Sequence, residues 1–348
     1  MGVTSVSLLC SPEGQGCRNT DMGSKLTVCR LDASHAAAIA DCFRRVYAES
    51  YANELFYDVA SLTREIEQGR LQSVGAVDEE GLVVGHMAMV CHPSAVFAEL
   101  GNTVVDPAAR GEGVAWQVGK ALTAWCMEKG YTGYLHYPTT DHHIMQRRSV
   151  ETGFETGLML SYIPAETDGQ VNVDKPSLRG ASTIVFNPLG ECEAQTLFCP
   201  ERYLALMREL AEAANLERQW RVSSGPTNDA TQATSVPMVK RGLVRLEVER
   251  VGADIGTVLQ GLCGRDEPCL QLDFSLADAN VEAGVEAARD AGFVFCGWLP
   301  GYRSSDVLRM QRFDLALTDL QPMVINPQAC ALLALCQDEL TAGSDKPI

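Results

Sequence analysis

"TVVDPAARGEGVA", residues 103–115, decides the fold. An apolar, β-branched run stops at Asp106 and Pro107, and two glycines then precede a segment whose apolar residues recur at helical spacing. The pattern predicts a strand, a tight loop and a helix. The first N–H groups of a helix lack partners and lie at the positive end of its dipole, which suits a phosphate. Gly111 and Gly113 would let such an anion approach the backbone closely.

Composition indicates a globular chain of one large or two ordinary domains. The chain has 348 residues, 46% of them hydrophobic, and this is neither a disordered nor a membrane-spanning composition. The formal charge of −17 comes from 28 Lys and Arg against 45 Asp and Glu. That charge argues against nucleic acid as a general partner and favours a cationic one, although a local basic patch can coexist with any net charge.

The cysteines indicate a reducing compartment. Thirteen cysteines, an odd number, are scattered without a C-x-x-C pair. This usage is typical of reduced thiols in a cytoplasmic protein rather than of a disulfide framework or a zinc site. We therefore expect a cytoplasmic protein with no bound metal and no membrane partner.

The segments around the glycine loop predict the order β-α-α-β-β-β-α-β-α-β. Three successive strands lead into the loop as a meander, and a strand, a helix and a last strand follow the long helix. The expected strands cover residues 26–31, 72–78, 82–92, 97–105, 131–138 and 154–164, and the expected helices cover 35–48, 59–69, 112–129 and 142–153.

This order resembles the GCN5-related N-acetyltransferase (GNAT) family over residues 26–164. The R-x-x-G-x-A arrangement of Arg110, Gly113 and Ala115 follows a strand, and "ETGF" (151–154) precedes the last strand, as in that family. The resemblance implies a mixed, mostly antiparallel α/β sheet flanked by helices. It also implies acetyl-CoA or another acyl-CoA as co-substrate, bound in a cleft where two neighbouring strands splay apart.

The same resemblance implies which residues hold coenzyme A. The pyrophosphate would lie on backbone N–H groups of residues 110–115, with Arg110 adding a positive charge; this set is Arg110, Gly111, Gly113, Val114 and Ala115. Val104 and Val105 would bind the pantetheine arm through their main chain, and one of their N–H groups would polarise the thioester carbonyl. The alternative is a glycine loop that merely turns the chain.

Glu99 is the candidate general base. It lies eleven residues before Arg110, where several family members keep their base, and direct transfer to an amine needs a base because the nucleophile must be neutral. The alternative is an edge carboxylate that faces water or pairs with an arginine.

The residue at the position of the usual proton donor differs from the family pattern. Many members have a Tyr four residues before the Gly of the Gly-Phe pair, and here that position is Ser149. An Asn of many members corresponds to His142. The candidates near the thioester sulfur are Tyr137, His142, His143 and Ser149, since a histidine can act as acid or base near neutral pH. Adjacent helical histidines cannot both face the cleft, and either could instead cap the helix or face solvent.

The remaining chain predicts a second, smaller α/β unit. Residues 1–24 are expected to be a flexible tail, 25–190 the catalytic domain with a closing strand at 181–189, 191–220 a connecting helix, 221–238 a flexible linker, and 239–348 the second unit. "DAGF" (290–293) echoes "ETGF", which suggests a degenerate GNAT-like half in a tandem pseudo-repeat, although ordinary βαβ recurrence could produce the same echo. Because this unit has no R-x-x-G-x-A loop, we expect it to bind no coenzyme A. Its expected role is to pack against the first unit and form a wall of the acceptor cleft.

Three functions remain open. The first is transfer of an acyl group, expected to be acetyl, to the amine of a small molecule, with carboxylates and aromatic groups of residues 49–58 on the acceptor side. The second is a non-catalytic acyl-CoA-binding or regulatory protein. The third is a transferase with an aminoacyl-tRNA donor, against which the acidity counts. The acceptor, the acyl chain and a homodimer stay open.

Overall fold

The computed structural model describes residues 26–141, 143–165, 178–222, 228–322 and 324–344, so the expected N-terminal tail lies outside the described residues. The first half follows the order that the sequence predicts. Its elements are β1 (Thr27–Leu31), α1 (Ala36–Tyr47), α2 (Val59–Glu67), β2 (Leu71–Val77), β3 (Val83–Val90), β4 (Ala98–Val105), α3 (Val114–Glu128), β5 (Gly133–His136), α4 (His143–Val150), β6 (Phe154–Ile163) and β7 (Gly180–Pro188).

The second half is also mixed α/β. Its elements are β8 (Gln195–Cys199), α5 (Leu204–Ala213), β9 (Arg218–Val222), β10 (Gln232–Met238), β11 (Leu243–Arg250), α6 (Ile255–Cys263), β12 (Cys269–Ser275), α7 (Val281–Asp290), β13 (Val294–Leu299), β14 (Val307–Phe313) and α8 (Pro327–Ser344). Short 3-10 turns precede several helices, and one of them, Val239–Arg241, leads into β11.

Two expectations about the middle of the chain are wrong. Residues 232–238, expected within a flexible linker, form β10, which pairs antiparallel with β11. Residues 191–220 hold α5 but also β8 and most of β9, which pair in parallel as a separate two-stranded sheet. The Ser, Thr and Pro residues that signal a break are compatible with β10 because it is an edge strand, where a proline need not donate to a neighbour.

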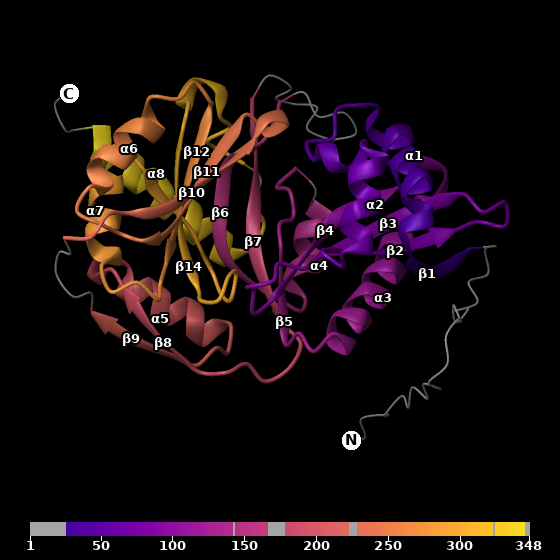
Figure 1. Cartoon of the computed structure of the whole chain (residues 1–348), viewed down its shortest axis with the longest axis horizontal. Coiled ribbons are helices and arrows are strands. Elements are labelled where there is room, and N and C mark those ends of the chain that lie inside the picture. The colour runs from indigo at the N-terminus through magenta and orange to yellow at the C-terminus, as the bar shows by residue number, and fades with distance from the viewer. Residues whose placement is uncertain (1–25, 142, 166–177, 223–227, 323, 345–348) are drawn as a thin grey trace.

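A single twelve-stranded sheet runs through both halves in the order β1-β2-β3-β4-β5-β7-β6-β13-β14-β12-β11-β10. Figure 1 shows the first half on one side of the molecule and the second half on the other, with β6 and β7 between them. The pairs β4–β5 and β11–β12 are parallel, and the other neighbours in this sheet are antiparallel.

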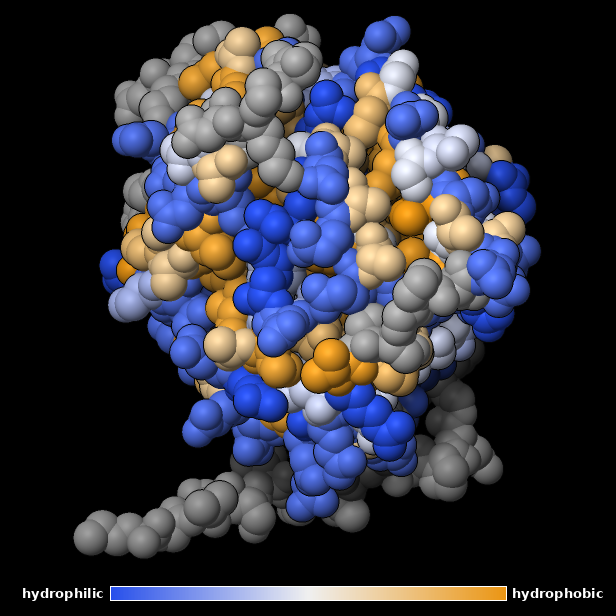
Figure 2. All heavy atoms as spheres, turned by 90° about the vertical axis from the view of Figure 1, so that its left-hand side faces the viewer, coloured by the Kyte–Doolittle hydropathy of each residue, from blue (hydrophilic) through white to orange (hydrophobic). Residues whose placement is uncertain are grey.

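Helices cover both faces of the sheet in the first half. Val83 packs with α1 and α2, whereas its neighbour Val84 packs with α3, because successive side chains of a strand point to opposite faces. A third and larger core joins residues of β6 and β7 to those of β12, β13 and β14, so the hydrophobic core crosses between the halves. The face of the second half seen in Figure 2 mixes hydrophilic and apolar residues.

The halves meet at two glycines. Gly157 on β6 is the ladder partner of Gly297 on β13. A Cβ on Gly157 would lie 2.5 Å from the Cα of Gly297, and one on Gly297 would lie 2.7 Å from the Cα of Gly157 and 2.7 Å from Ile184 Cδ1. A side chain at either position would therefore force the two strands apart.

The second half repeats the connectivity of the first. The series β11-α6-β12-α7-β13-β14 has the order of β4-α3-β5-α4-β6-β7, and in both series the first two strands are parallel while the second pairs with the last. In both series the last two strands also pair antiparallel. Gly157 and Gly297, which stand in corresponding places of the two series, face one another across the seam.

We predict that Gly297→Val destabilises the protein by about 1–3 kcal/mol or more, because the new side chain would overlap Gly157 and Ile184. Urea unfolding followed by fluorescence measures the change. Gly261→Ala in α6, where a Cβ would meet nothing within 4 Å, is the matched control and should leave stability equal or slightly raised. Equal stability of Gly297→Val and wild type would show that the seam tolerates a side chain.

Candidate active site

The site begins where β4 and β5 part. These parallel strands are paired only at Ala98↔Tyr134 and Glu99↔Leu135 among the described residues, while β4 continues along β3 to the Gly85↔Val105 pair. The corresponding strands of the second half, β11 and β12, pair at six positions. An opening between parallel strands, as expected for a pantetheine arm, therefore exists in the first half and is closed in the second.

A bulge at Asn102 shapes β4 beside this opening. Asn102 has a φ of 53°, and its Oδ1 accepts hydrogen bonds from Tyr51 Oη at 3.3 Å and Asn53 Nδ2 at 3.1 Å. Its main-chain oxygen lies 3.0 Å from His86 Nδ1, and burial lowers the pKa of His86 to about 4. The neutral imidazole therefore donates from Nδ1 to Asn102 and accepts from Ser73 at Nε2. Our sequence reasoning missed this bulge, although "GN" within a strand signals one.

The loop after β4 is anchored at its start. Asp106 accepts hydrogen bonds from the Ala108 N–H at 3.0 Å and from Arg45 Nε at 2.6 Å. The Arg45 guanidinium holds the pKa of Asp106 below its usual value. Arg110 follows with an exposed side chain, and its Nε lies 3.4 Å from the Val105 carbonyl oxygen.

The N-terminus of α3 is open. Gly111 and Gly113 have φ values of 87° and 75°, and a Cβ on either would meet nothing within 4 Å. Gly113 caps α3 without a side-chain hydrogen bond, and among the described residues no backbone carbonyl outside α3 accepts from the N–H groups of 111–115. Free N–H donors and the positive end of a helix dipole favour an anion at such a position.

The other residues expected at this loop differ in which of their atoms could contact a ligand. The side chains of Val104 and Val114 are buried in the cores on either face of the sheet, so only their main chains could contact a ligand. Val105 and Ala115 are half-buried at the two ends of the loop.

The corresponding loop of the second half is filled by the protein itself. The N–H of Gly252 donates to Thr231 Oγ1 at 3.0 Å, the N–H of Ala253 donates to the Asp229 carbonyl at 2.8 Å, and Asp254 Oδ1 accepts from the Thr231 N–H at 2.7 Å. Residues 229–231 thus occupy the place that a phosphate would need before α6.

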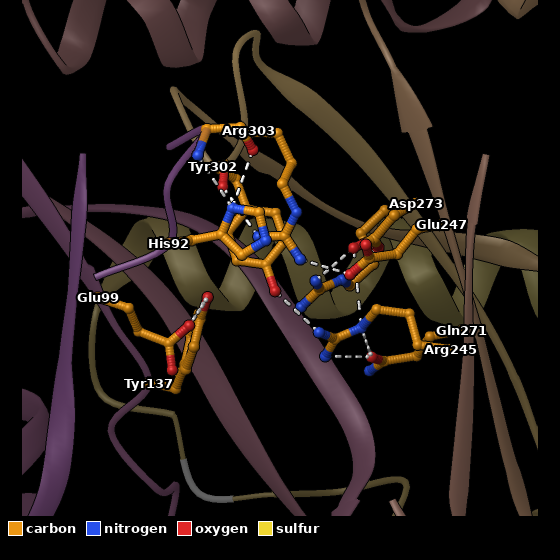
Figure 3. Close-up of polar contacts among 11 residues, drawn as sticks. His92, Glu99, Tyr137, Arg245, Glu247, Gln271, Asp273, Tyr302 and Arg303 are labelled. Carbon is orange, nitrogen blue, oxygen red and sulfur yellow. Dashed lines mark hydrogen bonds and ion pairs between the residues drawn. The ribbon is translucent and has the colours of Figure 1, made fainter. Parts of the chain in front are cut away.

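Glu99 and Tyr137 meet at the mouth of the opening. Glu99 is a half-buried residue of β4, and its Oε2 accepts a hydrogen bond of 3.3 Å from the hydroxyl of Tyr137, which follows β5 directly. Figure 3 shows the two side chains pointing toward one another. Burial, and then the charge of Glu99, raise the pKa of Tyr137 well above its usual value. Among the described residues, Glu99 thus pairs with a tyrosine rather than with an arginine.

Ser149 forms its own hydrogen bonds, separate from the Glu99–Tyr137 pair. Its buried hydroxyl donates to the Met145 carbonyl at 2.7 Å and lies 2.8 Å from His136 Nε2. Burial lowers the pKa of His136 to about 4, so its imidazole is neutral and donates to Ser149 from Nε2. The Ser149 proton is therefore held within α4. His143 begins α4, and His142 lies outside the described residues.

A loop of the second half closes over the start of β4. The N–H groups of Val96 and Phe97 donate to the Gly301 carbonyl at 2.9 and 3.1 Å. This contact brings Tyr302 and Arg303 of the same loop toward Glu99 and Tyr137, as Figure 3 shows.

Behind this loop lies a buried ionic network. Arg309 donates two hydrogen bonds to Asp273, at 2.6 and 2.7 Å. Arg245 donates to Tyr302 Oη at 2.9 Å and to Gln271 Oε1 at 2.9 Å. The bidentate pair and the further hydrogen bonds among these buried groups make the network rigid, although Gln271 Nε2 has no partner among the described residues.

The acidic residues expected on the acceptor side are engaged elsewhere. The exposed carboxylates of Glu49 and Glu54 pair with Arg44 at 3.3 Å and Lys240 at 3.9 Å, and Asp58 caps α2. The aromatic residues of the same segment instead form a packed cluster with Phe43. The expected acidic lining for a cationic amine is therefore not supported, because these carboxylates already have partners.

The described residues contain neither a metal-binding cluster nor a membrane-spanning helix. They contain no group of three or more His, Cys, Asp or Glu side chains that could hold a metal ion. None of their cysteines forms a disulfide. None of the described helices is both long enough and apolar enough to cross a membrane.

Comparison with known proteins gives one family match. The model of the acetyltransferase (GNAT) family matches residues 36–147. No curated protein matches the chain significantly.

Several solved structures are similar to part of the chain. YncA, a putative acetyltransferase from Salmonella typhimurium solved with acetyl-CoA, is 16% identical, with 49% of this chain and 98% of that chain covered and a TM-score of 0.39. A phosphinothricin acetyltransferase from Sinorhizobium meliloti, in complex with acetyl-CoA, is 18% identical, with coverages of 48% and 90% and a TM-score of 0.37. The ribosomal-protein-S18-alanine N-acetyltransferase from Escherichia coli is 12% identical, with coverages of 48% and 96% and a TM-score of 0.39.

The family match covers the strand, loop and helix on which the site is built, together with Glu99 and Tyr137. Residues 36–147 therefore match the acetyltransferase (GNAT) family, which is a family of transferases.

Proposed function

We propose that the protein transfers an acyl group, acetyl in the first instance, from acyl-CoA to the amine of a small molecule. One observation carries the proposal: the Glu99–Tyr137 pair lies at the mouth of the β4–β5 opening, on the strand that leads into the free N-terminus of α3. A phosphate site and a pair of proton-transferring groups thus lie at the two ends of one strand. The acceptor would enter beside Glu99.

Coenzyme A fits the residues of the loop. The pyrophosphate would accept hydrogen bonds from the free N–H groups of Gly111 to Ala115, and Arg110 would add a charge from the loop's exposed side. The pantetheine arm would follow the main chain of Val104 and Val105, which have no β5 partner in the described ladder. The acyl carbonyl would then lie near the Asn102 bulge, where a main-chain N–H can stabilise a developing negative charge.

Glu99 and Tyr137 would carry the protons. The amine nitrogen attacks the thioester carbonyl carbon, the carbon–sulfur bond breaks, Glu99 takes a proton from nitrogen and Tyr137 gives one to sulfur. The charge of Glu99 helps to raise the pKa of Tyr137, so protonation of Glu99 makes the phenol a better donor. The hydrogen bond between the two side chains then returns the proton from Glu99 to the phenolate.

The second half would be a degenerate GNAT-like unit that walls the acceptor side. Its repeated connectivity supports this assignment, and its filled loop before α6 argues against a second coenzyme A site. A reducing compartment such as the cytoplasm would keep the cysteines of the described residues as thiols. The chief competing function is non-catalytic binding of acyl-CoA, in which the Glu99–Tyr137 pair would have no catalytic role.

We predict that Gly113→Asp weakens coenzyme A binding severely, because it places a negative charge and a strained side chain at the left-handed position where the pyrophosphate should lie. Isothermal calorimetry measures the affinity. Gly130→Asp is the matched control: Gly130 has a φ of 87° and open space at the other end of the same helix. Equal affinities of both variants and wild type would remove the coenzyme A site from this loop.

We predict that Glu99→Gln keeps coenzyme A affinity and lowers turnover by about 10²-fold or more near neutral pH, the usual scale for a general base. Steady-state release of free thiol from acetyl-CoA, with a panel of amines, measures turnover. Turnover within a few-fold of wild type would make Glu99 structural. Absence of amine-dependent release in the wild type would favour the binder.

We predict that Tyr137→Phe slows the single-turnover rate by about 10²-fold, the low end of the range for an acid, whereas Ser149→Ala stays within a few-fold of wild type. The reason is that the Ser149 proton is committed to Met145, while the Tyr137 proton faces Glu99. The reverse pattern would identify Ser149 as the donor. Equal rates for both variants and wild type would assign the proton to water or to His142 or His143.

A further inference from the structure

We propose that the acceptor carries an oxyanion group, a carboxylate or a phosphate, and that the guanidinium of Arg241 binds it. This inference rests on the proposed function, since it names the class of amine that the same cleft would take. It replaces the purely cationic amine that the sequence favours.

Arg241 is a positioned cation that pairs with no carboxylate of the described residues. Its guanidinium lies 4.4 Å over the ring of Tyr162, and it forms no ion pair with any carboxylate in the described part of the chain. Stacking on a ring leaves the N–H groups at the guanidinium edge free for a planar, bidentate acceptor. Carboxylates and phosphates have that geometry.

The main chain around Arg241 is fixed. The Arg241 carbonyl accepts a hydrogen bond from Arg179 Nη2, and Arg179 also donates to the Ser161 carbonyl at 2.8 Å. Gly242, with a φ of 54°, then turns the chain into β11. The fixed main chain and the stacking on Tyr162 together restrain the guanidinium before a ligand arrives, which reduces the entropic cost of binding.

Arg179 adds to the positive potential. It is buried and donates only to oxygens of uncharged groups among the described residues. The neighbouring charge of Arg241, after burial, lowers the pKa of Arg179. Neither guanidinium group pairs with a carboxylate of the described residues. Two such adjacent groups attract an anion, even in a protein of formal charge −17.

Aromatic rings connect Arg241 to the proposed reaction centre. Tyr162 lies beneath Arg241 and meets the ring of Tyr137 edge-on, with centroids 6.4 Å apart, and Tyr137 contacts Glu99. Tyr51, which hydrogen-bonds to Asn102 on β4, also interacts electrostatically with Arg241. A molecule with its amine at Glu99 could thus reach Arg241 with an anionic end.

Other cations around the cleft are already neutralised. Arg309 pairs with Asp273, Arg303 with Glu247, and Lys240 with Glu54. Each of these cations has a described carboxylate partner, although Arg309 shares Asp273 with Arg245. Arg241 has no carboxylate partner among the described residues. The selection of an anionic acceptor is therefore assigned to Arg241 in particular.

The test uses the full chain, acetyl-CoA and matched acceptors. The acceptors are ω-aminocarboxylates from glycine to 6-aminohexanoate, 2-aminoethyl and 3-aminopropyl phosphate, the corresponding carboxamides and amino alcohols, and diamines. Wild type should prefer one anionic series over its neutral analogues, and the length series reports the spacing between the amine and the anion. Arg241→Met should lower kcat/KM for that series by about 10- to 100-fold, the worth of a charge-assisted hydrogen bond, and leave the neutral analogues unchanged.

The matched control is Arg265→Met, which removes the same charge from an exposed arginine paired with Glu267. It should change neither series. Equal or better use of neutral amines by the wild type, or equal losses in both series for Arg241→Met, would overturn the proposal.

A binding measurement separates this inference from the proposed activity. If none of the acceptors is acylated, the transferase proposal fails for these amines, and calorimetric titration with the same carboxylates and phosphates then decides the anion site. Binding that Arg241→Met removes and Arg265→Met retains supports the site. No binding, or binding that survives Arg241→Met, overturns it.

Discussion

The contact between Gly157 and Gly297 is the constraint on which the arrangement of the site depends. Because neither residue has a Cβ, β6 and β13 approach closely enough to pair, and two smaller sheets become one sheet of twelve strands. The core then runs continuously across the seam. As a result, the loop with Gly301, Tyr302 and Arg303 lies on the start of β4, and the turn with Arg241 lies on Tyr162.

The two halves share a connectivity but differ at the point where a ligand would bind. In the first half, β4 and β5 part after Glu99, the bulge at Asn102 interrupts the regular ladder, and the N–H groups before α3 are free. In the second half, β11 and β12 stay paired, and Thr231 with its neighbours satisfies the N–H groups before α6. The same order of elements thus forms an open site in the first half and a packed scaffold in the second. Function therefore depends on the site rather than on the fold.

The charges of the cleft differ from those of the whole chain. The net charge of −17 is a sum over the whole chain, whereas the second half places Arg245 and Arg309 close enough to interact electrostatically with Tyr137. Both are paired in a buried network that is costly to disturb, because removing one partner leaves the other charge buried and unpaired. Such a network can hold Tyr302 and its loop rigidly, so that the exposed polar groups of the cleft keep fixed positions.

Local features of the sequence were sufficient for the first half. The stretch 103–115 predicts its strand, loop and helix because turn residues and apolar spacing act over a few neighbours, and the same reasoning placed Glu99 on the strand before them. Tertiary structure alone decided that Tyr137 is the partner of Glu99, that Ser149 is committed to His136 and Met145, and that residues 232–238 form an edge strand. It also decided that Arg241, which no motif marks, lies over Tyr162. These contacts join residues far apart in the chain, and the packing of whole elements, rather than any short pattern, determines which of them meet.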